Sequence, residues 1–273
     1  ISWFRPEETR RFTYTPDHVV SRSTINAAVT YLLQRSEPIT YIYLQADCMD
    51  HLIHEQTLIN SISNAEANPQ SPSDSLSHIN SILGRSFFGS AEFKRYKGSD
   101  KSLEAGKWWL NEFLGTNKIP GKPISDRIEI ELIRYLLNNP RAHKNEIDAA
   151  MCATFPGFFT PNEDFINICL KSYCEENPPE SQRWCVQEKD WPRTRRQDVS
   201  EIGAALNQIG MRLGYNSTGK RPLMWIDEYN QIAYVFYIYA STAYSEIVFS
   251  SQHPPSKSIL VIPGGRSVLA IYK

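Results

Sequence analysis

Signals for helix starts and stops recur in the middle of this chain and constrain its fold more than any other feature. Asp126 and Glu129 have the spacing of a capping box, and apolar residues then repeat at helical intervals until Pro140. Thr160-Pro161-Asn162-Glu163 combines an N-cap residue, a proline at the first helical position and a reciprocating glutamate. These signals predict helices from Asp126 and from Thr160, with a short one over residues 145–155 between them.

Three such helices precede a short predicted strand over residues 183–188. Three helices with a strand hairpin predict a winged-helix-like domain over residues 121–197, whose third helix can enter a major groove of DNA. On that helix Asn162, Asn167 and Lys171 fall largely on the side away from the apolar face. They are the candidates for contacts with base edges. A three-helix module with a purely structural role is an equal alternative.

A helix followed by strands predicts an α+β domain over residues 198–273. Asp198 and Glu201 form another capping-box pattern, and Gly214 closes the helix that follows. The expected strands lie at residues 223–227, 232–240, 258–262 and 267–272. A helix followed by strands, with acids near strand ends, resembles a degenerate restriction-endonuclease fold.

The first part of the chain, residues 1–120, is predicted to be mainly helical. Apolar spacing predicts a helix at Ser23–Arg35 and another around Leu52–Leu58. Residues near 61–77 are rich in Ser, Asn and Pro and predict a linker, and residues 115–122 predict a second one. The fold class is therefore α+β, with domains over 1–120, 121–197 and 198–273.

Composition excludes several classes of protein. The chain is 41% hydrophobic and 22% charged with a net charge of −1, so it is neither disordered nor globally basic. No run approaches the ~20 apolar residues of a membrane helix, and the first residues lack the apolar core of a signal peptide. The 5 cysteines form no CxxC pair, which predicts reduced thiols in a cytoplasmic protein. The missing initiator Met, and an end at Lys273 inside a predicted strand, indicate a piece of a longer polypeptide.

Two segments of this neutral chain combine cations with aromatic rings. Residues 183–196 hold 5 basic and 2 acidic residues with Trp184 and Trp191, and residues 85–107 hold 6 basic and 3 acidic residues with four rings. Cations neutralise phosphates and rings stack on bases, so both segments predict DNA contact. The alternative is a solvated linker whose tryptophans pack inward. The predicted phosphate-binding residues are Arg183, Lys189, Arg193, Arg195 and Arg196, extended by Lys94, Arg95 and Lys97.

Catalytic alternatives are weaker. A restriction-type nuclease needs an Asp and a Glu-x-Lys around a divalent metal. Asp227, Glu228 and Glu246 are the candidates, but the strand over residues 233–239 holds neither acid nor lysine. Asn177-Pro178-Pro179-Glu180 lacks the aromatic residue of an amino-methyltransferase motif and predicts a loop.

A metal site is the remaining chemical alternative. In the segment Asp47–Glu55, Asp47 with His51 and Asp50 with His54 would each share a helix face, and such ligands suit zinc. The segment is not a HExxH motif, so a solvated polar helix face is the more frequent explanation. We therefore assign no metal to this segment.

Several strings together resemble the C-terminal region of large bacterial DNA modification methylases. They lie at residues 12–24, 155–161, 171–173, 189–195 and 261–266. The resemblance implies a non-catalytic region of a restriction-modification protein that binds double-stranded DNA or orients it. The S-adenosylmethionine-binding catalytic domain would lie upstream of Ile1, so no cofactor is expected in this segment. The expected partners are duplex DNA and that upstream methyltransferase domain. A scaffold that only docks on the catalytic domain is a further alternative.

Overall fold

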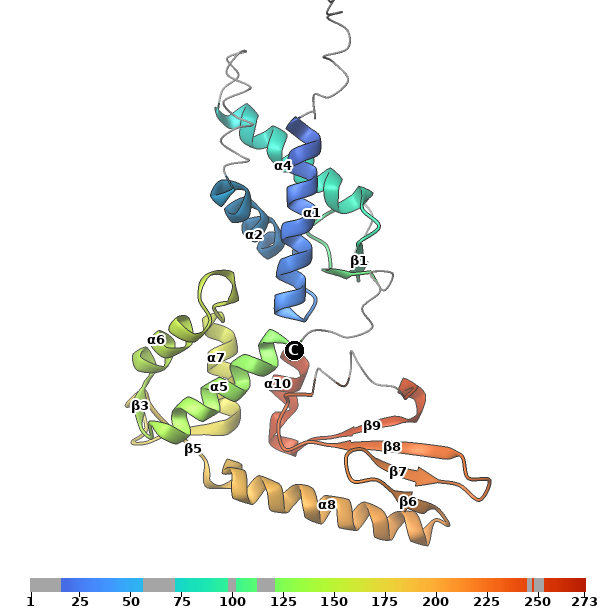
Figure 1. The fold of residues 1–273 in the computed structure, drawn as a ribbon. Coiled ribbons are helices and arrows are strands. Elements are labelled where there is room, and N and C mark those ends of the chain that lie inside the picture. The colour runs from blue at the N-terminus through green and yellow to red at the C-terminus, as the bar shows by residue number, and fades with distance from the viewer. Residues whose placement is uncertain (1–15, 56–71, 98–101, 112–120, 245–246, 248–252) are drawn as a thin grey trace, which may run out of the picture. The chain divides into compact units, whose positions relative to one another are not determined.

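The computed structural model describes residues 16–55, 72–97, 102–111, 121–244, 247 and 253–273 (Figure 1). These residues form 8 α-helices and three small sheets, a mixed α+β architecture. The chain divides into two compact units, residues 1–121 and 122–273. No helix among the described residues is long and apolar enough to cross a membrane.

The first unit is built on three helices: α1 (Pro16–Arg35), α2 (Tyr41–His54) and α4 (Pro72–Gly89). α1 packs against both others, and its Leu32 is fully buried together with Leu44 of α2 and Leu83 of α4. The helix expected at Ser23–Arg35 is confirmed and begins earlier. Of the helix expected around Leu52–Leu58, Leu52 and Ile53 belong to α2, which ends at His54, and residues 56–58 lie outside the described residues. The linker predicted near 61–77 is wrong in part, since α4 begins inside it.

A two-stranded ribbon completes the first unit. β1 (Phe93–Tyr96) pairs antiparallel with β2 (Lys107–Leu110), and Ile39 adds one bridge to Trp108. The ribbon closes the helical core with aromatic rings. Phe87 of α4 lies 5.1 Å from Phe93 and 5.6 Å from Trp108 between ring centroids.

The second unit begins with three helices and a three-stranded antiparallel sheet. The order along the chain is α5 (Ile124–Asn138), β3 (Ala142–His143), α6 (Lys144–Thr154), α7 (Glu163–Tyr173), β4 (Cys174–Glu176) and β5 (Arg183–Val186). β5 lies between β3 and β4. Apolar stripes of the three helices meet in one core that includes Leu132, Ile147 and Cys169. The three helices expected here are confirmed with different starts, and the expected strand begins at Arg183 as predicted.

Both expected helix starts in this region lie elsewhere. α5 begins after Pro123, and Asp126 and Glu129 do not cap it but are buried. The Nζ atom of Lys273 donates to Asp126 Oδ1 at 2.7 Å and to Glu129 Oε2 at 2.5 Å. The N-cap of α7 is Asn162 rather than Thr160, because the Asn162 side chain accepts the backbone N–H of Phe165 at 2.9 Å.

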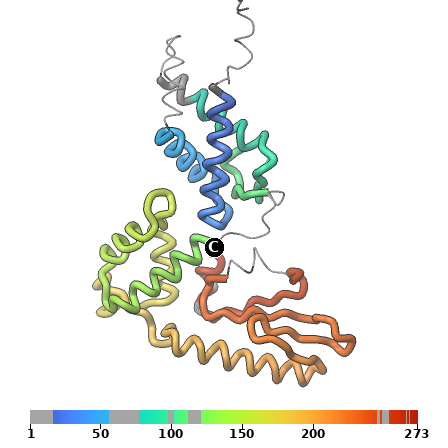
Figure 2. Tube along the Cα trace, in the orientation of Figure 1, coloured from blue at the N-terminus to red at the C-terminus, as the bar shows by residue number. Residues whose placement is uncertain are grey.

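The rest of the second unit is a long helix beside a four-stranded sheet. α8 (Pro192–Arg212) precedes β6 (Asn216–Thr218), β7 (Leu223–Ile226), β8 (Ile232–Ile238) and β9 (Ser258–Val261), which lie in that order in the sheet. β6, β7 and β8 are antiparallel, and β9 is parallel to β8. Figure 2 traces the chain along α8 and back through the strands. Gly210 allows α8 to lie close to β7, since a Cβ at this position would be 2.8 Å from Trp225 Nε1.

Two further expectations for this region are wrong. The long helix begins at Pro192 rather than Asp198, and Asp198 and Glu201 lie within it. Residues 267–272 form a helix, α10 (Ser267–Tyr272), instead of a strand. α10 packs on α7, with the rings of Tyr272 and Phe165 stacked 5.6 Å apart. Short 3₁₀ turns occupy Gly157–Phe159, Glu188–Asp190, Pro255–Lys257 and Gly264–Arg266.

Candidate nucleic-acid interface

The predicted interface residues divide between the two units. Lys94, Arg95 and Lys97 belong to the first unit. In the second unit, Asn162, Asn167 and Lys171 lie at or on α7, Arg183 and Trp184 on β5, and Lys189, Trp191, Arg193, Arg195 and Arg196 around the start of α8. The start of α8 therefore carries the densest group of predicted residues.

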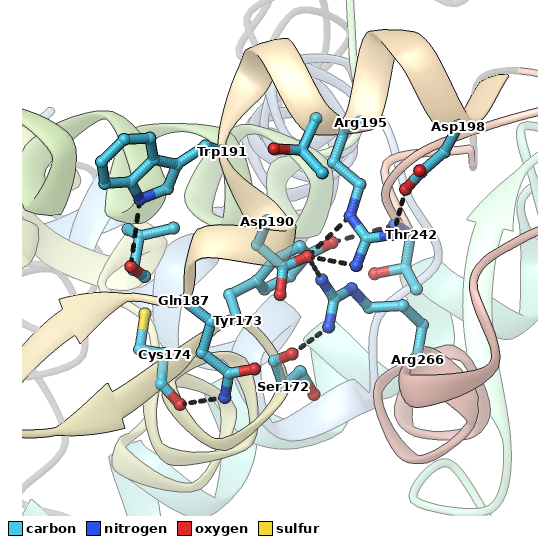
Figure 3. Close-up of polar contacts among 12 residues, drawn as sticks. Ser172, Tyr173, Cys174, Gln187, Asp190, Trp191, Arg195, Asp198, Thr242 and Arg266 are labelled. Carbon is cyan, nitrogen blue, oxygen red and sulfur yellow. Dashed lines mark hydrogen bonds and ion pairs between the residues drawn. The ribbon is translucent and has the colours of Figure 1, made fainter. Parts of the chain in front are cut away.

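Local sequence explains why α8 starts where it does. Trp191 is the N-cap residue, with extended φ and ψ of −63° and 144°, and Pro192 occupies the first helical turn. Proline suits this position because its missing N–H needs no partner there. The Trp191 indole N–H donates to the carbonyl of Val186 at 3.3 Å, which ties the start of the helix to β5 (Figure 3).

Arg195 has a structural role at this helix start. Its Nε and Nη2 atoms lie 2.8 and 2.7 Å from Oδ1 of Asp190, whose side chain is fully buried. Its Nη1 donates to Asp198 at 2.8 Å (Figure 3). Two carboxylates engage this guanidinium, so the structure gives Arg195 an internal role that the sequence did not predict.

Arg266, near the C-terminal end of the second unit, binds the same buried carboxylate. It forms an ion pair with Asp190, donates to the carbonyl of Ser172 and lies 3.7 Å from the ring centroid of Tyr173. Burial lowers the pKa of this guanidinium. Residue-by-residue reasoning missed Arg266. The segments 171–173, 189–195 and 261–266, which the sequence singled out for their resemblance, could have pointed to it. Each of the three supplies residues that contact Arg266 or Asp190.

The neighbouring cations face solvent. Arg183, Lys189, Arg193 and Arg196 are exposed, and none of them forms an ion pair with another described residue. Arg193 and Arg196 are three residues apart on α8 and therefore share a face. Trp191 keeps about half of its surface exposed, at 52%, whereas Trp184 packs partly on the core. Exposed cations beside an exposed ring are the combination that the sequence predicted for DNA contact.

α7 carries acidic residues beside the residues predicted to contact base edges. Asn162 is the N-cap, and its Nδ2 donates to the hydroxyl of Tyr272 at 3.1 Å, so its side chain is already engaged. Exposed Glu163 and Asp164 occupy the first turn. Those charges repel phosphates at the helix end that would enter a groove. Asn167 is half-buried and Lys171 is exposed near the other end of α7.

In the first unit, part of the basic segment packs inward. Phe87 and Phe93 are buried in the core, so these rings are not available to bases as predicted. The guanidinium of Arg95 lies 5.3 Å from the ring centroids of both Phe88 and Trp108. Lys97 is exposed and follows the strand with a positive φ of 54°.

The nuclease candidates do not assemble among the described residues. Asp227 Oδ1 accepts the backbone N–H groups of Tyr229 at 3.0 Å and of Gln231 at 2.8 Å, so it holds its own hairpin turn. Glu228 is exposed beside it, and Glu246 lies outside the described residues. No group of three metal-ligating side chains occurs in the described part of the chain.

The metal candidate at Asp47–Glu55 resolves into pairs along α2. His51 lies 3.1 Å from Glu55, and His54 lies 3.5 Å from Asp50, each pair one helical turn apart. Glu55 also accepts the hydroxyl of Ser23 at 2.5 Å. This is the polar helix face that the sequence offered as the alternative.

Comparison with known protein families, with curated proteins and with solved structures finds no significant match.

Proposed function

We propose that this chain is a DNA-engaging, non-catalytic region of a DNA modification methylase-like protein. In this proposal the second unit grips the backbone of double-stranded DNA. Arg183, Lys189, Arg193 and Arg196 neutralise phosphates, and Trp191 packs against the sugar-phosphate edge. Methyl transfer is left to an upstream domain that would hold S-adenosylmethionine.

The order of elements supports this proposal. Helix, strand, two helices and a hairpin, with β5 between β3 and β4, is the order of a winged helix. α8 and the β6-β7-β8-β9 sheet, with β9 parallel to β8, fit the opening of a restriction-endonuclease-like fold. Both kinds of domain occur in proteins that bind DNA, although a fold alone does not assign a function.

The observation that carries the proposal is that the arginines at the start of α8 divide into one held inside the unit and two exposed to solvent. Asp190 binds Arg195 and Arg266 inside the unit, which fixes the first helical turn. Arg193 and Arg196 remain exposed on that turn. The helix N-terminus adds partial positive charge, so the two arginines and the backbone N–H groups favour the same anion.

The test is a salt titration of duplex binding, followed by fluorescence anisotropy. We expect the Arg193→Gln/Arg196→Gln variant to bind a random-sequence duplex more weakly. Its salt slope should be shallower by about 1.8, since each lost phosphate contact removes about 0.9. Arg212→Gln, at the far end of the same helix, is the matched control and should bind normally. Unchanged binding by the double variant would reject this interface and favour the scaffold alternative.

A further inference from the structure

The β1–β2 ribbon of the first unit has two different faces. Side chains alternate along a strand, and the register pairs Arg95 with Trp108 and Tyr96 with Lys107. Arg95 and Trp108 share the face that packs on α4, where Phe88 and Phe87 lie. The opposite face therefore carries Lys94, Tyr96 and Lys107, together with a buried Trp109.

Tyr96 is an exposed ring surrounded by lysines. It keeps 43% of its surface exposed, and Lys94 Nζ lies 5.3 Å from its ring centroid. Lys107 is its direct cross-strand partner, and exposed Lys97 is the next residue along the chain. Directly opposed residues in an antiparallel pair have Cβ atoms about 5 Å apart, so the side chain of Lys107 starts beside that of Tyr96.

From this arrangement we infer a binding site for single-stranded nucleic acid on the β1–β2 ribbon. Tyr96 stacks on an unpaired base, and Lys94, Lys97 and Lys107 neutralise the phosphates on either side of it. An unpaired base offers its π-face to a protein ring, whereas a base inside a duplex is covered by its neighbours. This site belongs to the first unit and does not depend on the proposed duplex contact.

The other ligand that combines lysines with an exposed ring is an anionic membrane surface. Membrane binding needs a broad apolar area beside the cations. The ribbon does not offer one among its described residues, because Trp109 is buried, with 9% exposure, and Leu110 is equally buried. A single exposed ring between lysines fits one base better than a layer of lipid.

The test measures binding of labelled oligothymidine and oligouridine to the full chain by anisotropy. The Arg193→Gln/Arg196→Gln background removes the proposed duplex site. We expect Tyr96→Ala to weaken binding by ten-fold or more, as expected for loss of one stacked base. Tyr96→Phe should retain binding. Tyr43→Ala is the matched control, because Tyr43 has the same exposure, 42%, in the same unit.

Lysine variants and a second substitution of Tyr96 complete the test. Lys94→Gln/Lys97→Gln/Lys107→Gln should reduce the salt slope by about 2, at about 0.7 per contact with a single strand. If circular dichroism shows that Tyr96→Ala does not fold, Tyr96→Leu retains the bulk without the aromatic ring and decides the question. Equal binding of both oligonucleotides supports a site that recognises the ring and the phosphates alone, and preference for one supports a site that also reads the 2′-hydroxyl or the base methyl group. Unchanged binding by folded Tyr96→Ala or by Tyr96→Leu, or binding only to phosphatidylserine vesicles, would overturn the inference.

Discussion

The two basic-aromatic segments, residues 85–107 and 183–196, have similar composition but hold their internal arginine in different ways. Arg95 in the first lies between the rings of Phe88 and Trp108 and donates to the carbonyl of Ser102 at 2.5 Å. Arg195 in the second lies between the carboxylates of Asp190 and Asp198. One arginine is held by ring faces and the other by ion pairs.

This difference shows that a cation in a basic stretch can be part of the interior. In both segments one arginine is used internally, and other cations of the same segment remain exposed. The first segment exposes Lys97 and Lys107, and the second exposes Arg193 and Arg196. Net charge finds such segments, but only the position of each residue on its strand or helix shows which cations can meet a ligand.

The largest expected effect comes from removing the carboxylate of the second segment. Asp190→Ala leaves Arg195 and Arg266 without their shared buried partner, and breaking a buried ion pair costs about 3–5 kcal/mol. Urea unfolding followed by circular dichroism measures this loss. Asp198→Ala removes a partly exposed partner of Arg195, with 38% side-chain exposure, and should cost less than about 1 kcal/mol. Equal losses in the two variants would show that Asp190 does not organise this cluster.

The sequence predicted the elements that depend on local periodicity. Apolar spacing located α5, α6 and α7, and the strand over Arg183–Val186 was found from its residues. Helix starts were less predictable. Two acids three residues apart can form a capping box at the start of a helix, but they can equally lie on one buried face and bind a distant lysine. Asp126 and Glu129 belong to the second kind, and their partner Lys273 lies at the far end of the chain.

Tertiary packing decided the remaining differences. Residues 267–272 form a short apolar run that predicted a strand, but Leu269 is fully buried in the helical core, and α10 packs on α7. At the candidate site, composition identified the segment around Trp191 but not the inward direction of Arg195. Placing the helix start at Pro192 would have supplied the helical phase that separates Arg195 from Arg193 and Arg196.

A smaller effect is expected from the arginine of the first segment. Arg95→Met retains an apolar stem and removes the charge over two rings, so we expect a loss of about 1 kcal/mol in the free energy of unfolding. Arg85→Met is the control, because Arg85 is exposed and lies 3.5 Å from a half-exposed Asp17. Its loss should stay below about 0.5 kcal/mol. If Arg95→Met is no more costly than the control, the ring contacts do not stabilise the first unit.

The smallest effect concerns Asp47, a half-buried acid of the first unit that forms no ion pair with an arginine among the described residues. Burial raises its pKa from 3.8 to about 6. Because the folded pKa lies above the unfolded one, its contribution to stability is present below about pH 4 and is lost as the pH rises through 6. Solvent screening limits the loss to less than about 1 kcal/mol at pH 7.

Asp47→Asn removes this dependence on pH, because an amide stays neutral. We expect the variant and the wild type to have equal melting temperatures at pH 4, and the variant to melt higher at pH 7. Asp50→Asn, at the exposed neighbour that contacts His54, is the control and should not produce that divergence. A difference between Asp47→Asn and the wild type that stays constant from pH 4 to pH 7 would show that Asp47 titrates normally. Burial would then not raise the pKa of Asp47, and this acid would no longer contrast with Asp190, which two arginines hold in the second unit.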